Sequence, residues 1–318
     1  MLSLMTIASV PAEEGNRGFT DGEIAGGISA PGKPIQILQG QVIDRLGVST
    51  DGDWITYTVF SSDLRNNEVW IIFADGSGRR RIEAPHGYKN SPVIRAGGGR
   101  SPRVLYLSLA GSAKGDLADG IYLRSLEGRE TRWELFMAGS YRDLALSQDG
   151  DYLAASSGNW NAARVRSTIA VFPLEASGQR KGPPRTMLPD PRGQVRSITF
   201  SPDSRTVFFE CAVEDARFPW GRPHVYSAEN KADSRARILV MDASSPAAAK
   251  APRGVHLYFL RDANRVCSID PGTDREVEVV GIRGLTPTCL AWDQRGERLL
   301  LGLQASSSVA GLLAIDLH

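Results

Sequence analysis

Four stretches of the chain repeat one alternation of apolar and polar positions around a short turn. They are VSTDGDWITY from Val48, LSQDGDYLAA from Leu146, FSPDSRTVFF from Phe200 and WDQRGERLLL from Trp292. In each stretch a bulky apolar residue precedes a polar one, a turn follows, and a second apolar run begins. Two apolar runs joined by a turn rich in Ser, Asp and Gly are typical of a β-hairpin. The pattern therefore predicts four homologous hairpins.

The spacing of these hairpins predicts two more. The interval from Asp51 to Asp149 and that from Asp203 to Arg295 are each about twice the length of one unit. Degenerate copies fit both gaps, with second strands at Val104–Leu107 and Val255–Phe259. A third strand is expected after each hairpin, in the segments VWIIFADG, IYLRSLEG, IAVFPLEA, ILVMDASS, VCSIDPGT and LLAIDLH.

A repeat of roughly 45 to 55 residues with about four strands is typical of a β-propeller blade. The sixth unit stops at its third strand, whereas KPIQILQ (Lys33–Gln39) is a strand-like run without a unit of its own. Pairing the two would leave no long exposed edge. We predict an all-β, six-bladed β-propeller over residues 33–318, closed by this N-terminal strand. Residues 1–32 are expected to be a flexible leader or the remnant of a signal segment.

The composition is that of an ordinary globular protein, with 42% hydrophobic and 23% charged residues in 318. A net charge of +1 gives no long-range attraction to nucleic acid or an anionic membrane. No run is long enough for a membrane span, and we expect a monomer. The three cysteines, Cys211, Cys267 and Cys289, have no disulfide or zinc spacing. The compartment stays open: periplasmic or secreted if Met1 to Ala12 is a trimmed signal peptide, otherwise cytoplasmic.

The segment 42–83 resembles a blade of the TolB-like, WD40-like propellers. It resembles even more the first blade of the propeller in prolyl-oligopeptidase-family serine peptidases, such as acylaminoacyl peptidases and lasso-peptide isopeptidases. The residues that carry the resemblance are Ser49, Asp51, Gly52, Trp54, Trp70, Asp75, Gly76, Arg79 and Arg80. It is weaker at 90–107, 144–156 and 197–210. The resemblance implies a fold more than a chemistry.

The resemblance does not carry the peptidase activity with it. In that family a separate α/β-hydrolase domain holds the nucleophile in a Gly-x-Ser-x-Gly motif, and this sequence has no such motif. The four histidines do not pair at metal-ligand spacing. We therefore expect no enzyme activity in this chain on its own, no catalytic residue, no metal and no cofactor. A filter or docking role can still be carried over from the peptidase propellers.

Candidate binding residues come from the connections between the second and third strands. These connections and those between blades emerge on one face of a propeller, here named the long-loop face. The segment from Ala212 to Ala236 is expected to be a long loop, and aromatic residues with arginine are typical of binding hot spots. The predicted ligand- or partner-binding residues are Arg217, Phe218, Trp220, Arg222, His224 and Tyr226, with Trp160 and Asn161 from another loop. The alternative is that these aromatics pack over the rim.

Three functions are consistent with the sequence. The first is a non-catalytic propeller that binds a protein, peptide or small ligand on its long-loop face. The second is a propeller subunit or fragment of a prolyl-oligopeptidase-type peptidase, which gates peptide access to a separate α/β-hydrolase domain. The third is a propeller lyase or hydrolase with a site in its central channel, which acidic or metal-ligating side chains converging at one channel mouth would favour.

Overall fold

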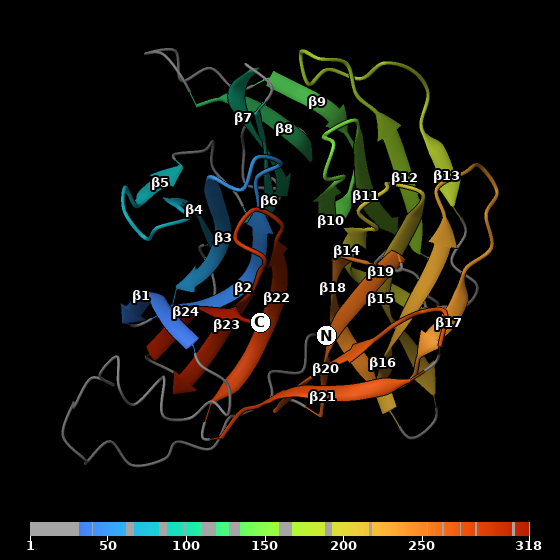
Figure 1. Ribbon diagram of the computed structural model, residues 1–318. Coiled ribbons are helices and arrows are strands. Elements are labelled where there is room, and N and C mark those ends of the chain that lie inside the picture. Colours follow the sequence, from blue (N-terminus) through green and yellow to red (C-terminus); the bar gives the residue numbers. More distant parts are fainter. Residues whose placement is uncertain are drawn as a thin grey trace.

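The computed structural model describes the chain from Gly32 to Leu317 apart from short gaps (Figure 1). The described residues are 32–39, 41–61, 67–82, 88–97, 100–109, 119–126, 134–158, 167–187, 193–215, 218–252, 254–262, 264–273, 275–283, 285–306 and 309–317. The predicted leader, residues 1–32, lies outside them except for Gly32.

These residues form six four-stranded antiparallel sheets. Their first strands are β2 (Gln41–Val48), β6 (Tyr88–Gly97), β10 (Tyr141–Leu146), β14 (Gly193–Phe200), β18 (Ala243–Ala251) and β22 (Thr286–Asp293). The second strands are β3 (Trp54–Ser61), β7 (Arg100–Leu109), β11 (Tyr152–Gly158), β15 (Thr206–Asp215), β19 (Gly254–Arg261) and β23 (Arg298–Ser306). The third strands are β4 (Asn67–Phe73), β8 (Gly120–Ser125), β12 (Ser167–Pro173), β16 (Phe218–Glu229), β20 (Arg265–Ile269) and β24 (Val309–Asp316).

The fourth strands are β5 (Arg80–Ile82), β9 (Glu134–Ala138), β13 (Arg185–Met187), β17 (Arg237–Val240) and β21 (Glu276–Gly281). The last sheet takes its fourth strand from the beginning of the described chain, because β1 (Gly32–Gln39) pairs antiparallel with β24. We number the sheets 1 to 6 in the order of their first strands, so that sheet 1 begins with β2 and sheet 6 with β22.

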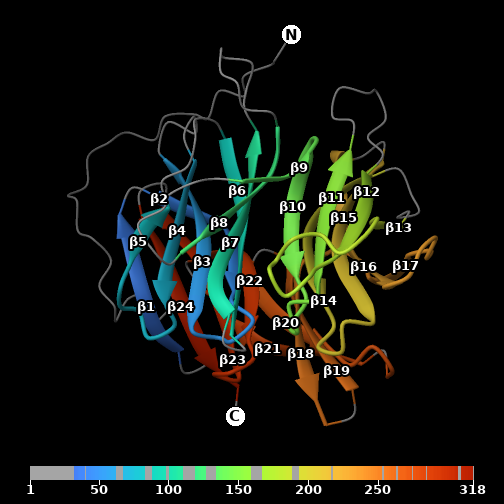
Figure 2. The same cartoon turned by 90° about the horizontal axis from the view of Figure 1, so that it is seen from above.

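The sheets are arranged around a central axis, with the first strands innermost (Figures 1 and 2). Each first strand contacts the first strands of two other sheets, in the order β2, β6, β10, β14, β18, β22 and back to β2. This arrangement is a β-propeller, so the predicted all-β propeller fold is confirmed. The predicted hairpins around Asp51, Asp149, Asp203 and Arg295 are also confirmed as the turns between first and second strands.

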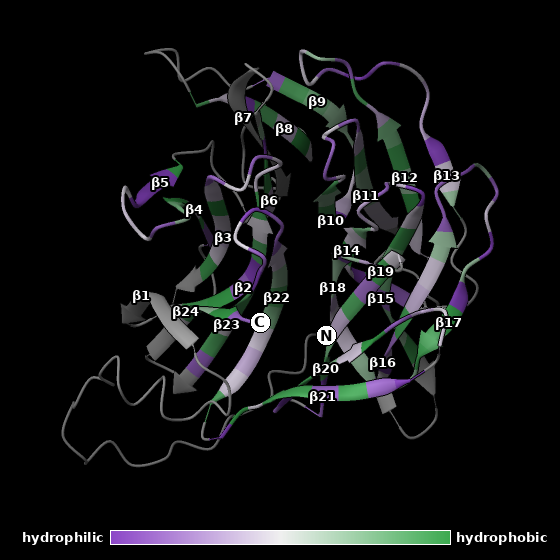
Figure 3. Cartoon of the chain, viewed as in Figure 1, coloured by the Kyte–Doolittle hydropathy of each residue, from purple (hydrophilic) through white to green (hydrophobic). Residues whose placement is uncertain are grey.

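The core lies between neighbouring sheets. Each of six clusters of buried apolar side chains joins two sheets; Ile71 of sheet 1, for example, packs with Ile94 of sheet 2. Inner strands are therefore covered on both faces, which is why their sequences read as long apolar runs. The short outer strands β5 and β13 are hydrophilic by comparison (Figure 3). Fully burying one such apolar side chain contributes about 1.5–3 kcal/mol.

The repeated Ser-x-Asp turn has a direct structural reason. Ser49 Oγ donates to Asp51 Oδ1 at 2.6 Å and accepts from the Trp54 N–H at 2.9 Å, which closes the turn at both ends. Ser147 with Asp149 and Ser201 with Asp203 form the same hydrogen bonds. Gly52 has a φ of 76° at the turn tip, a backbone conformation that glycine adopts without strain. The repeated residues therefore stabilise the conformation of the turn.

Two expectations for sheet 4 are wrong. The segment ILVMDASS does not supply its third strand, because β17 (Arg237–Val240) is the outermost strand of the sheet. The third strand is β16, within the segment expected to be a long loop, and it pairs with β15 from Thr206↔Glu229 to Asp215↔Phe218. The prolines and polar residues of this segment suggested a loop. Pairing along a long partner strand outweighs this weak local preference.

Candidate functional site

Every first strand carries a β-bulge at the same level of the propeller. The pairing with the second strand shifts between Ile43 and Arg45, Asn90 and Val93, Tyr141 and Asp143, Arg196 and Ile198, Ser244 and Ala247, and Pro287 and Cys289. A bulge inserts an unpaired residue and re-aims the side chains around it. Six bulges at one level therefore direct an additional ring of polar groups toward the axis.

Three bulges contain a serine with positive φ. Ser91, Ser197 and Ser245 have φ values of 48°, 49° and 51°, an uncommon conformation for a residue other than glycine. Such a conformation costs on the order of 1–3 kcal/mol and persists only where surrounding contacts hold it. Two of these bulges direct backbone N–H groups at buried acids. The Ile198 N–H donates to Asp143 Oδ2 at 2.8 Å, and the Ser245 N–H donates to Glu210 Oε2 at 3.2 Å.

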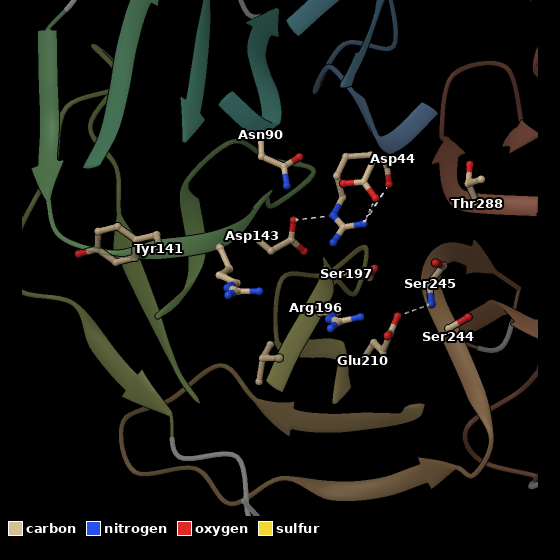
Figure 4. A pocket seen from close by; sticks show the side chains of 13 residues that line it. Asp44, Asn90, Tyr141, Asp143, Arg196, Ser197, Glu210, Ser244, Ser245 and Thr288 are labelled. Carbon is tan, nitrogen blue, oxygen red and sulfur yellow. Dashed lines mark hydrogen bonds and ion pairs between the residues drawn. The ribbon is translucent and has the colours of Figure 1, made fainter. Parts of the chain in front are cut away.

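The bulges surround a pocket of about 540 Å³ on the axis (Figure 4). All six first strands and β15 contribute to its lining: Asp44, Arg45, Asn90, Tyr141, Arg142, Asp143, Val195, Arg196, Ser197, Glu210, Ser244, Ser245 and Thr288. Most of these residues lie in the first halves of their strands. The pocket is therefore nearer the face from which the first strands start, which is the long-loop face. Three acidic and three arginine side chains converge there.

Asp143 is the centre of a network that joins four sheets. Its Oδ1 accepts a hydrogen bond from Ser91 Oγ at 2.5 Å and lies 3.5 Å from Arg45 Nε, while its Oδ2 accepts from the Ile198 N–H. The Arg45 Nη1 atom also donates to the carbonyl and the carboxylate of Asp44, at 2.9 and 3.2 Å. Burial acts to lower the pKa of Arg45, but the carboxylates of Asp44 and Asp143 outweigh it and raise that pKa. Arg45 therefore stays charged.

Glu210 is different because no ion pair joins it to a cation among the residues that the structure describes. Its side chain is buried, and burial is the main reason why its pKa is raised, opposed by the Ser245 N–H and by the charges of Arg45 and Arg196. Arg196 lies directly opposite Glu210 in the β14–β15 register. Its guanidinium nevertheless bonds to Gln194 Oε1, at 2.8 Å from Nε. Glu210 is thus a carboxyl group whose pKa lies above its ordinary value and which faces a polar pocket.

A second cavity of about 370 Å³ follows the axis toward the opposite face. Apolar residues such as Leu46, Leu144 and Leu290 line it, together with residues of the hairpin turns. Gln148 Nε2 donates to Gln294 Oε1 at 3.4 Å between the turns of sheets 3 and 6. Among the described residues, Asp149 is the one charged residue in this lining, whereas six charged residues line the pocket at the long-loop end.

The structure describes five of the eight residues that the sequence proposed as a binding site. Trp160, Asn161 and Arg217 lie outside the described residues. Phe218 and Trp220 lie on β16, at the end of the β15–β16 hairpin that reaches the long-loop face. Tyr226 is a core residue, 1% exposed, whose ring stacks on Phe209 with 5.6 Å between centroids. It is therefore not available to a partner, which corrects the expectation that it contributes to the binding surface.

Arg222 and His224 are brought together by one acidic residue. The Arg222 Nη1 atom lies 3.6 Å from Asp242 Oδ1, and the Asp242 N–H donates to His224 Nδ1 at 3.0 Å. Asp242 lies in the connection that leads into β18, two residues before Ser244 of the pocket lining. The hairpin residues are thus linked through this connection to the rim of the pocket.

Sequence reasoning missed the pocket residues, although the repeat contained a signal for them. Counting four residues back from the apolar positions Val48, Leu146, Phe200 and Trp292 gives Asp44, Arg142, Arg196 and Thr288. All four line the pocket. These polar residues recur at one position of the repeat, inside strands whose two faces should both be buried. That recurrence was the available signal in the sequence.

Two kinds of feature are absent from the described part of the chain. It contains no group of three or more His, Cys, Asp or Glu side chains placed to hold a metal ion. It also has no helix with the length and apolarity needed to cross a bilayer.

Comparison with known proteins extends the fold assignment but not the function. No protein-family model and no curated protein matches the sequence. A gluconolactonase from Xanthomonas campestris has a TM-score of 0.56 at 14% identity, with 93% of each chain covered. TolB from Acinetobacter baumannii has a TM-score of 0.51 at 14% identity, with 83% of this chain and 65% of that chain covered. A prolyl endopeptidase matches with a TM-score of 0.49 at 12% identity, over 89% of this chain and 42% of that one.

These neighbours differ in function, and identities this low show a common architecture alone. The match to TolB confirms the resemblance that the repeat predicted. The chain is therefore a β-propeller with the architecture seen in TolB.

Proposed function

We propose that this chain binds a protein, peptide or small ligand on its long-loop face, with part of the ligand entering the central pocket. The observation that carries the proposal is that the buried acids Asp143 and Glu210 and the partly buried Arg45 lie around one cavity on the axis. Taking such groups out of water is costly, and apolar residues of similar volume often serve stability equally well. Convergent polar groups in a preformed cavity, two of them with shifted pKa values, support a binding site.

The β15–β16 hairpin supplies the rim of the proposed site. Arg222 and His224 lie beside Asp242 at the pocket edge, and Phe218 and Trp220 lie toward the hairpin end. A ligand that reached from the pocket to this hairpin would be extended, as a peptide chain is. A protein or peptide partner therefore fits the proposal as well as a compact molecule does.

The proposed site depends on a closed ring. We take the six sheets as six blades, with the β1–β24 pairing as the closure. Under this interpretation all six bulged strands are held at fixed distances from the axis, and the pocket is preorganised before any ligand arrives.

The convergence of acidic side chains at one channel mouth also favours a second candidate, a propeller lyase or hydrolase. Glu210, with its raised pKa, would be the acid or base of such an enzyme. The neighbouring charges of Asp143 and Arg45, however, lie against each other, with 3.5 Å between Asp143 Oδ1 and Arg45 Nε. Binding is therefore the function proposed first.

Blocking the pocket tests the proposal. A panel of small acids, amines, sugars and short peptides is screened by thermal shift, and the hits are measured by calorimetry on two variants. Ser244→Tyr fills the pocket without removing a charge and should weaken binding at least tenfold. Gln148→Tyr adds the same ring at the opposite mouth and should leave binding unchanged. Equal affinities in wild type and Ser244→Tyr would reject the site.

The hairpin is tested on the same hits. Trp220→Ala should leave the fold intact and weaken binding by roughly 2 kcal/mol, the usual scale of a hot spot. If Trp220 instead packs over the rim, the melting temperature falls while the affinity stays the same. Measuring both quantities on this variant separates the two possibilities.

A further inference from the structure

The pair formed by Arg196 and Glu210 suggests what chemistry the pocket recognises. The two residues are directly opposite each other in the β14–β15 register, on strands whose bulge turns both into the pocket. Residues in that relation have Cβ atoms about 4.5–5.5 Å apart, and opposite charges so placed ordinarily attract. Among the described residues, however, no ion pair joins them. Arg196 bonds to Gln194, and Glu210 accepts from the Ser245 N–H.

The second buried acid of the pocket, Asp143, already has hydrogen-bond donors and a cation beside it. Asp143 accepts from Ser91 Oγ and from the Ile198 N–H, and it lies beside Arg45 Nε. A cationic group of a ligand would therefore have to compete with these partners for the Asp143 carboxylate. Arg196, in contrast, has only the neutral amide of Gln194 as its partner in the described structure. The cation that an entering group can recruit most readily is Arg196.

Resting on the proposed function, we infer that the ligand carries a carboxylate, which binds between the Arg196 guanidinium and the Glu210 carboxyl. A guanidinium offers two parallel N–H donors that match a carboxylate. A protonated carboxyl group offers one O–H donor to the same ligand oxygen or its neighbour. The group comes either from a small organic acid or from a peptide C-terminus, because both present the same two oxygens.

Binding of a carboxylate beside Glu210 should depend on pH. The charged groups that face Glu210 are Asp44 and Arg45 from β2, Arg142 and Asp143 from β10, and Arg196 from β14, while β18 supplies Ser244 and Ser245. A bound carboxylate adds a negative charge beside Glu210 and favours its protonated form. Binding then takes up a proton, so affinity falls as the pH rises through the pKa of Glu210. A bound amine would show the opposite dependence.

The test compares matched acid and amide probes on the full chain by calorimetry between pH 5 and 8. The probes are succinate against succinamide, and acetyl-trialanine with a free against an amidated C-terminus. We expect at least tenfold tighter binding of the acid in one of the pairs, and that pair identifies the source of the carboxylate. We also expect affinity to weaken toward pH 8. Equal binding of acid and amide in both pairs, or tighter binding toward pH 8, would overturn the inference.

Three variants assign the effect to the two residues. Arg196→Gln should lower affinity for the acid probe at least tenfold and remove the preference for acid over amide. Glu210→Gln, whose amide still donates a hydrogen bond, should keep affinity within about threefold and abolish the pH dependence. Arg205→Gln is the matched control, since Arg205 lies in a turn with its side chain 87% exposed, and it should change nothing. An Arg196→Gln variant that is folded and retains the acid preference would overturn the assignment.

Failure of this inference is distinguishable from failure of the proposed function. If other compounds of the screening panel bind and Ser244→Tyr blocks them, while neither acid probe binds, the pocket is a binding site for a different chemistry. If Ser244→Tyr blocks nothing, both proposals fall.

Discussion

At the residue scale, hydrogen bonds and an ion pair around Asp143 organise the pocket. Asp143 accepts from a side chain of sheet 2 and from a backbone N–H of sheet 4, and it lies beside a guanidinium of sheet 1. A buried carboxylate without such donors would cost several kcal/mol. The serines with positive φ thus have a structural role, because the bulges of Ser197 and Ser245 direct N–H groups at the acids and Ser91 donates its hydroxyl to Asp143.

The first prediction concerns this junction. Asp143→Asn keeps the shape of the side chain but removes the charge that faces Arg45 and weakens the bonds from Ser91 and Ile198. Hydrogen bonds to charged groups contribute about 1.5–3 kcal/mol, so the free energy of unfolding should fall by about 2 kcal/mol in urea denaturation. Glu278→Gln serves as the control, because Glu278 is 52% exposed in its ion pair with Arg265 and such pairs contribute about 0–1 kcal/mol. Equal stabilities of the two variants would show that Asp143 does not hold the ring.

At the element scale, the hairpin turns connect neighbouring sheets as well as their own strands. Ser204 Oγ of sheet 4 donates to Asp149 Oδ2 of sheet 3 at 2.8 Å, and Arg298 Nη2 of sheet 6 donates to the Ala74 carbonyl of sheet 1 at 2.8 Å. Partial burial acts to raise the pKa of Asp149, but hydrogen bonds from Ser147, Asp151 and Ser204 outweigh it and lower that pKa. The ionised form of Asp149 is therefore the one that the fold stabilises.

The second prediction is a pH dependence of stability. A carboxyl whose pKa is lower in the folded state stabilises the fold above its unfolded pKa, and this contribution disappears as the pH falls through the folded value. Wild type should therefore exceed Asp149→Asn in melting temperature at pH 6, and the difference should shrink below the ordinary pKa of 3.8. In a Ser204→Ala background, which lacks one of the hydrogen-bond donors to Asp149, the melting-temperature difference caused by Asp149→Asn at pH 6 should be smaller. A difference that stays constant from pH 6 to pH 2.5 would exclude this role for Asp149.

The β15–β16 hairpin shows where element prediction failed. Apolar alternation located the strands on each side of the Ser-x-Asp turns, since turn chemistry and periodicity agree there. Pro219, Gly221 and Pro223 obscured β16 because they are poor strand formers in isolation. In the sheet, the backbone accommodates them through a register shift, and Gly221 has a φ of 78°.

At the scale of the whole molecule, each sheet buries both faces against its neighbours, so the stability of any one sheet depends on the ring. The pairing of β1 with β24 joins the first described strand to the last. If this pairing closes the propeller, its loss leaves β24 as an exposed edge strand, and exposed edges promote aggregation.

The third prediction is that truncations on either side of β1 behave differently. Deleting residues 1–30 should leave the melting temperature and the oligomeric state unchanged, because β1 begins at Gly32. Deleting residues 1–40 removes the strand and should produce a less stable, aggregating protein. Size-exclusion chromatography with light scattering and thermal melts measures both. Equal stability and monodispersity of the two truncated forms would contradict closure by β1.

The sequence by itself determined the propeller, because a propeller blade is specified locally. Each hairpin is encoded by its own turn residues and its own apolar runs, and the repetition of this local code implies the architecture. The pocket was decided only by tertiary structure. Arg45, Asp143 and Glu210 lie in three different units, and their proximity depends on how far each sheet stands from the axis and on where each strand bulges. A bulge depends on pairing with another strand, so the side chains that it turns inward become apparent only once the sheets are assembled.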